Sequence, residues 1–201
     1  MTTTIVARFD ATLYDAAVMR VLGIDPGTRV CGYACIECAP RRVRTAPNET
    51  GVRIRNAVRA GSTARPHLVA AGAIDLGSSK RPLAERLVKL ADAIDDCVER
   101  FTPECIALEE AFFGKSVQSA LRLGEARGVV LLAAARRSLP IHQYAPATIK
   151  LRVAGHGAAT KDALARMVGR AISVSVDEFP ADVSDATAIA LCHAWSGTQS
   201  W

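Results

Sequence analysis

The chain has 201 residues, 50% of them apolar, and a formal net charge of +5 at pH 7. This length fits one domain with a sizeable core and leaves no room for a second full domain. No apolar run reaches the roughly 18 residues that span a membrane, and Asp10 and Asp15 lie where a signal peptide carries an uncharged core. We therefore expect a cytoplasmic protein with no membrane partner.

The first predicted elements are strands. Residues 20–25 and 30–38 have the pattern of two strands joined by a Pro-Gly turn, and residues 68–75 have that of a third. Between the last two, residues 39–66 hold seven arginines and one acid, so this segment carries +6 and the rest of the chain −1. The basic character lies in one segment, which favours a polyanionic partner.

Strands and helices alternate in the remainder. Apolar residues recur at the 3.6-residue spacing of a helix between residues 80 and 101. The elements expected after it are strands at 105–109 and 140–144 and helices at 116–137, 160–171 and 181–195. Three antiparallel strands followed by strand–helix units predict an α/β fold, a mixed sheet with helices on both faces.

Six cysteines raise the question of a metal site or a disulfide. Cys35 and Cys38 form a Cys-x-x-Cys pair, but in a strand-like segment residues three apart point to opposite faces. No second Cys or His pair completes a zinc site by its spacing, so reduced, structural thiols are predicted. His142, His156 and His193 are likewise predicted to be structural or surface residues.

Four acids are expected to meet where strands end. Asp25 ends the first strand and Glu109 the fourth, and the carboxyl ends of strands border the functional crevice of open α/β sheets. Asp182 and Asp185 are three apart, hence on one face at the start of the last helix. The alternatives are a turn residue for Asp25 and a helix N-cap for either later aspartate. Glu109 and Glu110 face opposite ways, so one of them would be a solvated charge.

Such a cluster restricts the chemistry. Carboxylates within about 4–6 Å of each other raise one another's pKa, so four of them are stable ionised only beside cations. Oxygen ligands select Mg²⁺ or Mn²⁺. Two such ions about 3.5–4 Å apart activate a water and stabilise the leaving oxygen of a phosphodiester. Asp25 would then bridge the two ions.

Four stretches resemble the RuvC family of bacterial Holliday-junction resolvases. They are GIDPGTRVCGY, ALEEAFFGKSVQSALRLGEARGVVLLAA, YAPATIKLRVAGHGAATK and ADVSDATAIALCHA, and the resemblance covers residues 19–38 and 68–195 in order. It implies an RNase H-like fold and a homodimer that resolves four-way DNA junctions by paired symmetric nicks in recombination and repair. It also implies two Mg²⁺ ions per subunit, with Mn²⁺ as a substitute, and docking to the RuvA and RuvB branch-migration proteins.

The resemblance assigns roles to individual residues. The residues that match the family's metal-binding acids are Asp25, Glu109, Asp182 and Asp185. Glu109 rather than Glu110 falls in the family's place, and Lys150 and Lys161 match basic residues near the scissile phosphate. Phe112 matches an aromatic placed against bases near the crossover, with core packing as the alternative.

Further DNA and partner contacts are expected from three segments. Lys115 is expected to bind DNA near Phe112. Helix 116–137 carries a stripe that would let a partner helix approach closely, with packing on the protein's own sheet as the alternative. The stripe consists of Val117, Leu121, Gly124 and Gly128. Arg53 and Arg55 would share one face of a strand and, with Arg59, extend the DNA footprint, unless the segment is a disordered loop.

The expected domain organisation has four parts. Residues 1–18 precede the family's usual start as an N-terminal extension, and Met19 is a candidate first residue. The nuclease domain comprises residues 19–195, with the basic insertion at 39–66, and residues 196–201 form a tail.

Three other functions compete with a junction resolvase. GIDPGT also resembles the first phosphate loop of sugar-kinase and actin-like ATPases, but those enzymes need a second domain. Another RNase H-like nuclease would act on other structured DNA or RNA. A DNA-binding protein without catalysis would have no need of the complete set of acids.

Overall fold

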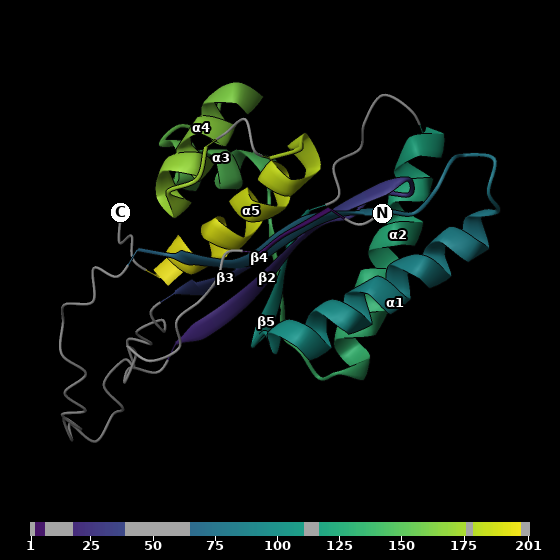
Figure 1. The fold of residues 1–201 in the computed structure, drawn as a ribbon. Coiled ribbons are helices and arrows are strands. Elements are labelled where there is room, and N and C mark those ends of the chain that lie inside the picture. Colours follow the sequence, from purple (N-terminus) through teal and green to yellow (C-terminus); the bar gives the residue numbers. More distant parts are fainter. Residues whose placement is uncertain (1–2, 7–17, 39–64, 111–116, 176–178, 198–201) are drawn as a thin grey trace, which may run out of the picture.

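One sheet organises the computed structural model, which describes residues 3–6, 18–38, 65–110, 117–175 and 179–197. The strands, in chain order, are β1 (Thr3–Val6), β2 (Met19–Asp25), β3 (Val30–Cys38), β4 (His67–Asp75), β5 (Cys105–Glu109) and β6 (Ile141–Tyr144). The helices are α1 (Leu83–Phe101), α2 (Val117–Arg136), α3 (Pro146–Ala154), α4 (Lys161–Ile172) and α5 (Ala181–Ala194), with a 3-10 turn at Trp195–Gly197. Figure 1 shows α1 and α2 on one face of the sheet and α3, α4 and α5 on the other.

The pairing of the strands confirms the predicted mixed sheet. Their order in space is β1-β4-β3-β2-β5-β6. β2, β3 and β4 pair antiparallel, whereas β5 runs parallel to β2 and β6 runs parallel to β5. All five predicted strands form within one residue of their expected bounds.

β1 was not among the predicted elements. It pairs antiparallel with β4, from Thr3 opposite Ala73 to Val6 opposite Ala70, and forms an edge of the sheet. Four residues are at the lower limit for recognising an alternating pattern. The segment 1–18, expected as an extension before the domain, therefore contributes a strand to the sheet.

The helices match the predicted ones except for one addition. α1 begins at Leu83, after Pro82, rather than at residue 80. α4 begins after Thr160, whose hydroxyl accepts a hydrogen bond of 3.2 Å from the Ala163 N–H. α3 was not predicted, because its nine residues bury only Ile149 and Val153 and so show too little apolar periodicity.

Alternation along the strands divides the core into two clusters. Leu22 and Ile24 of β2 pack with α1 and α2, and Val21 packs with the helices on the other face. Cys35 and Cys38 lie in different clusters for the same reason, which confirms that this Cys-x-x-Cys pair forms no joint site. All six cysteines are buried and free, as predicted.

Two glycines let α5 lie directly on the sheet. A Cβ atom at Gly23 would lie 2.3 Å from the Ala186 carbonyl oxygen, and one at Gly32 would lie 2.0 Å from the Asp182 carbonyl oxygen. Both distances are far below van der Waals contact, so only glycine permits this approach. The first turn of α5 is thereby placed over the neighbouring strands β2 and β3.

Within the described residues, no helix combines the length and the apolar character that crossing a bilayer requires.

Candidate active site

Two of the four acids come from neighbouring parallel strands. The register of β2 and β5 pairs Gly23 with Ala107 and Ile24 with Leu108, and the next residue on each strand is an acid, Asp25 or Glu109. Adjacent parallel strands lie about 4.8 Å apart, so the two carboxylates extend side by side from the sheet. Both side chains are half-buried.

The other two acids come from the first turns of α5. Asp182 and Asp185 are half-buried, and the close approach of α5 at Gly32 brings this turn to the end of β2. The N-cap position of α5 is Pro180, so neither aspartate has the N-cap role that was the alternative. The structure therefore brings together all four acids that the sequence singled out.

The electrostatics of the cluster are most evident at Asp25. Burial, which is the largest cause, and the neighbouring charges of Asp185, Glu109 and Asp182, in that order, together raise the pKa of Asp25 from 3.8 to about 7, while Lys161 lowers it. A carboxyl group with this pKa lacks a positive partner of sufficient strength. The cluster is thus short of positive charge in the absence of a cation.

Glu109, rather than Glu110, belongs to this cluster. Burial and the charge of Asp185 raise the pKa of Glu109, while Lys161, Lys150 and Arg127 lower it. Glu110 is exposed, whereas Glu109 is among the charges that raise the pKa of Asp25. The alternation at the strand end thus turns Glu109 inward and leaves Glu110 as the solvated charge.

Two lysines lie beside the acids. The Lys161 ammonium donates a hydrogen bond of 3.2 Å to Asp185 Oδ2, and this carboxylate raises the pKa of Lys161. Lys161 is exposed and Lys150 is half-buried, and both are close enough to lower the pKa of Glu109. The rim of the cluster therefore carries cations that could contact a phosphate.

Two buried arginines support the site, and neither was among the predicted site residues. Arg127 of α2 donates to the Glu109 carbonyl oxygen and to the Gln143 side chain, which ties α2 to the ends of β5 and β6. Arg86 of α1 is 2% exposed and donates to the Thr28 carbonyl in the turn after Asp25. An arginine in a helical segment is typical of a solvent-exposed charge. Only the tertiary fold shows which backbone carbonyl groups these two side chains reach.

Several predicted site residues lie outside the described residues. They are Phe112, Lys115, Arg53, Arg55 and Arg59, together with most of the basic insertion at 39–66.

Comparison with known proteins identifies relatives along most of the chain. A family model described as crossover junction endodeoxyribonuclease RuvC matches residues 48–193. The protein of that name from Chloroflexus aurantiacus is 36% identical over 178 residues, which are 89% of this chain and 94% of that protein. The one from Desulforamulus reducens is 38% identical over 181 residues, 90% of this chain and 96% of that protein.

Solved structures show the same relationship. Thermus thermophilus RuvC in complex with a Holliday junction substrate superposes with a TM-score of 0.71 at 30% identity, covering 88% of this chain and 93% of that one. The yeast mitochondrial Holliday junction resolvase shares the fold alone, with a TM-score of 0.54 at 16% identity over 90% of this chain and 82% of that one. The family model, the identities of 36% and 38% to proteins covered over nearly their whole length, and the shared RNase H-like sheet agree. The chain belongs to the RuvC family of crossover junction endodeoxyribonucleases, hydrolases that act on DNA.

Proposed function

We propose that this protein resolves four-way DNA junctions by metal-dependent hydrolysis, with paired symmetric nicks made by a homodimer. The observation that carries the proposal is the group of four carboxylates that includes Asp25, whose pKa rises to about 7 through burial and its three acidic neighbours. The matched relatives include a RuvC bound to a Holliday junction. The group of carboxylates and the similarity to RuvC proteins therefore support the same reaction.

The acids fit a divalent cation. Oxygen donors from Asp25, Glu109, Asp182 and Asp185 suit Mg²⁺, and the charge deficit at Asp25 favours a cation there. Two Mg²⁺ ions, or Mn²⁺ in their place, would supply an activated water and stabilise the leaving oxygen of the phosphodiester. Asp25 lies between Glu109 of β5 and the two aspartates of α5, so it is the residue that would contact both ions.

The protein's own groups orient the DNA. Lys161 donates a hydrogen bond of 3.2 Å to Asp185, and because its side chain is 78% exposed, its other N–H groups can donate to a phosphate oxygen. Lys150 is suited to the same role beside Glu109. Phe112 and Lys115, which follow β5 in the chain, are proposed to contact the DNA near the crossover.

The dimer is proposed to form through α2. Its exposed face includes Val117, 79% exposed, and Leu121, 64% exposed, while Gly124 and Gly128 have open space where a side chain would lie. The helix packs on its own sheet through a different face, which contains Ala126, Val130 and Ala134. The stripe is therefore available to a second subunit, which argues against packing on the sheet as its purpose.

Two further parts of the proposal rest on family membership. RuvA and RuvB are the expected partners, and the cytoplasm is the expected location, because the DNA substrate and the branch-migration proteins lie there.

The test is cleavage of a synthetic four-way junction with Mg²⁺. The wild-type protein is expected to yield symmetric nicked duplexes, and Asp25→Asn and Asp185→Asn should bind the junction but not cut it, because they remove metal ligands and leave the phosphate-binding cations. Equal cleavage of linear duplex or structured RNA would instead indicate another nuclease of this fold. Full cleavage by Asp25→Asn would refute the proposed chemistry.

A further inference from the structure

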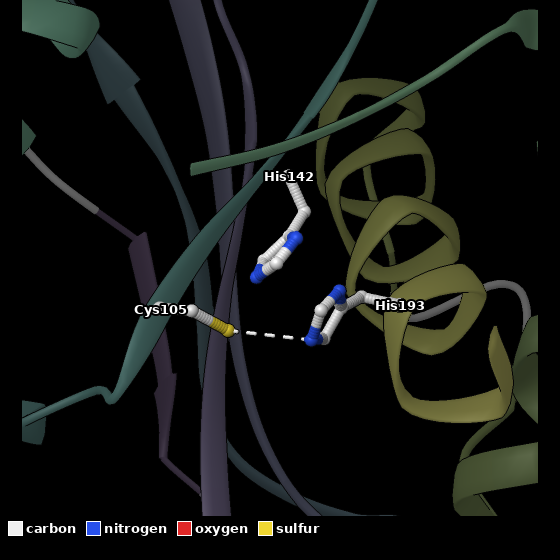
Figure 2. A group of neighbouring side chains, drawn as sticks. All are labelled: Cys105, His142 and His193. Carbon is white, nitrogen blue, oxygen red and sulfur yellow. Dashed lines mark hydrogen bonds between the residues drawn. The ribbon is translucent and has the colours of Figure 1, made fainter. Parts of the chain in front are cut away.

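A second cluster of ligand side chains lies away from the acids, between β5, β6 and α5. Cys105, His142 and His193 each offer one ligand atom, and these atoms all lie within 4.8 Å of one another. Figure 2 shows Cys105 reaching from β5 toward His193 of α5, with the His142 ring beside that of His193. The spacing of these residues in the sequence gave no indication of the group, since the three elements meet only in the fold.

The register of the strands places the group on one face of the sheet. Cys105 and Ala107 alternate toward α5, and His142 of β6 pairs with Ala107 of β5. His193 lies in the last turn of α5, which packs on the same face. Three elements therefore converge on one point.

The distances suit a tetrahedral metal. A zinc ion with Zn–S of about 2.3 Å and Zn–N of about 2.0–2.1 Å separates sulfur and nitrogen ligands by roughly 3.6 Å. Cys105 Sγ and His193 Nε2 are 3.4 Å apart. The His142 nitrogen lies within 4.8 Å of both other ligand atoms, so it would need to approach them by at most about 1.5 Å. His142 is half-buried on the edge strand β6, and a rotation of its ring would supply this approach.

The surroundings of His193 suit a ligand role. Tyr144 Oη lies 2.7 Å from His193 Nδ1, so the phenol oxygen can accept the Nδ1 proton and leave the Nε2 lone pair directed at the cluster. A hydrogen bond to the non-ligating nitrogen is the usual support of a metal-bound histidine. Cys105 is 4% exposed and His193 1% exposed, whereas His142 is half-buried. Of the three side chains, His142 is therefore the one past which an ion would enter.

We infer that Cys105, His142 and His193 bind one Zn²⁺ ion, with water in the fourth position. A thiolate and two imidazoles select zinc over Mg²⁺, which prefers oxygen ligands. The ion is separate from the acid cluster: Cys105 begins the strand that ends at Glu109, about 13 Å away, and His193 lies eight residues along α5 from Asp185, about 12 Å away. The ion would link α5 to β5 and β6. It would thereby stabilise the position of α5, which carries Asp182 and Asp185, against the strand that carries Glu109.

The alternative is a hydrogen-bonded core group, with the thiol proton between Cys105 and His193. Zinc titration of the untagged full-length protein, stripped of metal, distinguishes the two. We expect one Zn²⁺ per chain, and Co²⁺ in its place should give a thiolate-to-cobalt charge-transfer band and the intense visible bands of a tetrahedral ion. Zinc at a hundredfold excess over its Kd should raise the melting temperature by about 5–10 °C.

Matched variants locate the site. Cys105→Ser and His142→Gln should lose the cobalt bands, and circular dichroism should show that they remain folded. Cys97→Ser, a buried cysteine in the other core cluster, and His156→Gln, an exposed histidine, should keep the bands. Asp185→Asn should keep them as well, which separates this site from the acids. The inference is overturned if the wild-type protein binds no zinc, or if zinc binding survives in both Cys105→Ser and His142→Gln.

Discussion

At the scale of single residues, Asp25 should make the stability of the metal-free protein depend on pH. Its pKa rises from 3.8 to about 7 on folding, so between these values the folded state binds more protons than the unfolded state. The free energy of unfolding therefore falls as the pH rises from about 4 to about 7 and levels off above it. Glu109, whose pKa is also raised, adds to this fall.

Asp25→Asn should remove most of that penalty. We expect it to raise the free energy of unfolding near pH 8 by on the order of 1–3 kcal/mol and to flatten the pH dependence, as measured by denaturant unfolding without metal. Millimolar Mg²⁺ should stabilise the wild-type protein more at about pH 8 than at about pH 5.5, because the ion competes with the proton. Glu110→Gln is the control, since this acid is exposed outside the cluster. A wild-type protein more stable at pH 8 than at pH 5.5 without metal would contradict the raised pKa.

The adjacent glutamates should differ in cleavage. Glu109→Gln is expected to reduce the single-turnover rate on a junction by on the order of a thousandfold or more, because it removes a metal ligand. Glu110→Gln should remain within a fewfold of the wild-type rate. The reverse result would mean that the strand end is displaced by one residue.

At the scale of elements, the contact between α5 and the sheet determines where Asp182 lies. Gly32→Ala would put a Cβ atom 2.0 Å from the Asp182 carbonyl oxygen, so α5 must shift. We expect a loss of about 1–3 kcal/mol in the free energy of unfolding and a lower cleavage rate. Gly124→Ala is the control for stability alone, because Gly124 lies in the proposed dimer stripe. Nothing in the subunit lies within 4 Å of the added atom, so this variant should leave the fold intact or stabilise α2 by up to about 1 kcal/mol. Equal losses for both variants would show that helix placement is not the cause.

The proposed dimer interface on α2 can be tested by measuring the oligomeric state of the protein. Leu121→Asp puts a charge at a residue that is 64% exposed in the subunit, so it should leave the subunit folded while abolishing the dimer. Light scattering should give the subunit mass for this variant and twice that mass for the wild-type protein. Leu151→Asp, at an exposed leucine of α3 on the other face of the sheet, should keep the dimer. A wild-type protein that is monomeric at micromolar concentration yet cuts symmetrically would refute the interface.

The spacing of apolar residues in the sequence predicted those helices and strands that bury a continuous apolar face. β2 and β5 are apolar runs that end on acids, and the three-residue spacing of Asp182 and Asp185 is visible without a structure. α3 was missed because it buries two residues only. Arg127 could not be found in this way, since its partners belong to strands distant in sequence and the bonds are made to a backbone carbonyl and an amide.

At the scale of the whole molecule, the basic insertion is expected to extend the DNA footprint. Replacing Arg53, Arg55 and Arg59 by Ala should weaken binding to junction and duplex alike, because phosphate contacts carry little sequence information. The log-log salt slope of binding should flatten by roughly two to three units, since each lost phosphate contact changes it by about 0.9. The cleavage rate at saturating protein should stay nearly unchanged. An unchanged slope would exclude the insertion as a DNA contact, and a selective loss of junction binding would mean that it recognises junction shape.

The separation of the acids along the chain has a consequence for synthesis of the protein. Asp25 is made early, Glu109 midway, and Asp182 and Asp185 only with α5, the helix that covers one face of the sheet. Because domains form as the chain emerges from the ribosome, a nascent or prematurely terminated chain that stops before α5 has two of the four acids and an uncovered sheet face. Such a fragment should be unable to cut DNA and should be a substrate for proteases, so we expect incomplete synthesis of this nuclease to cause no stray nicks.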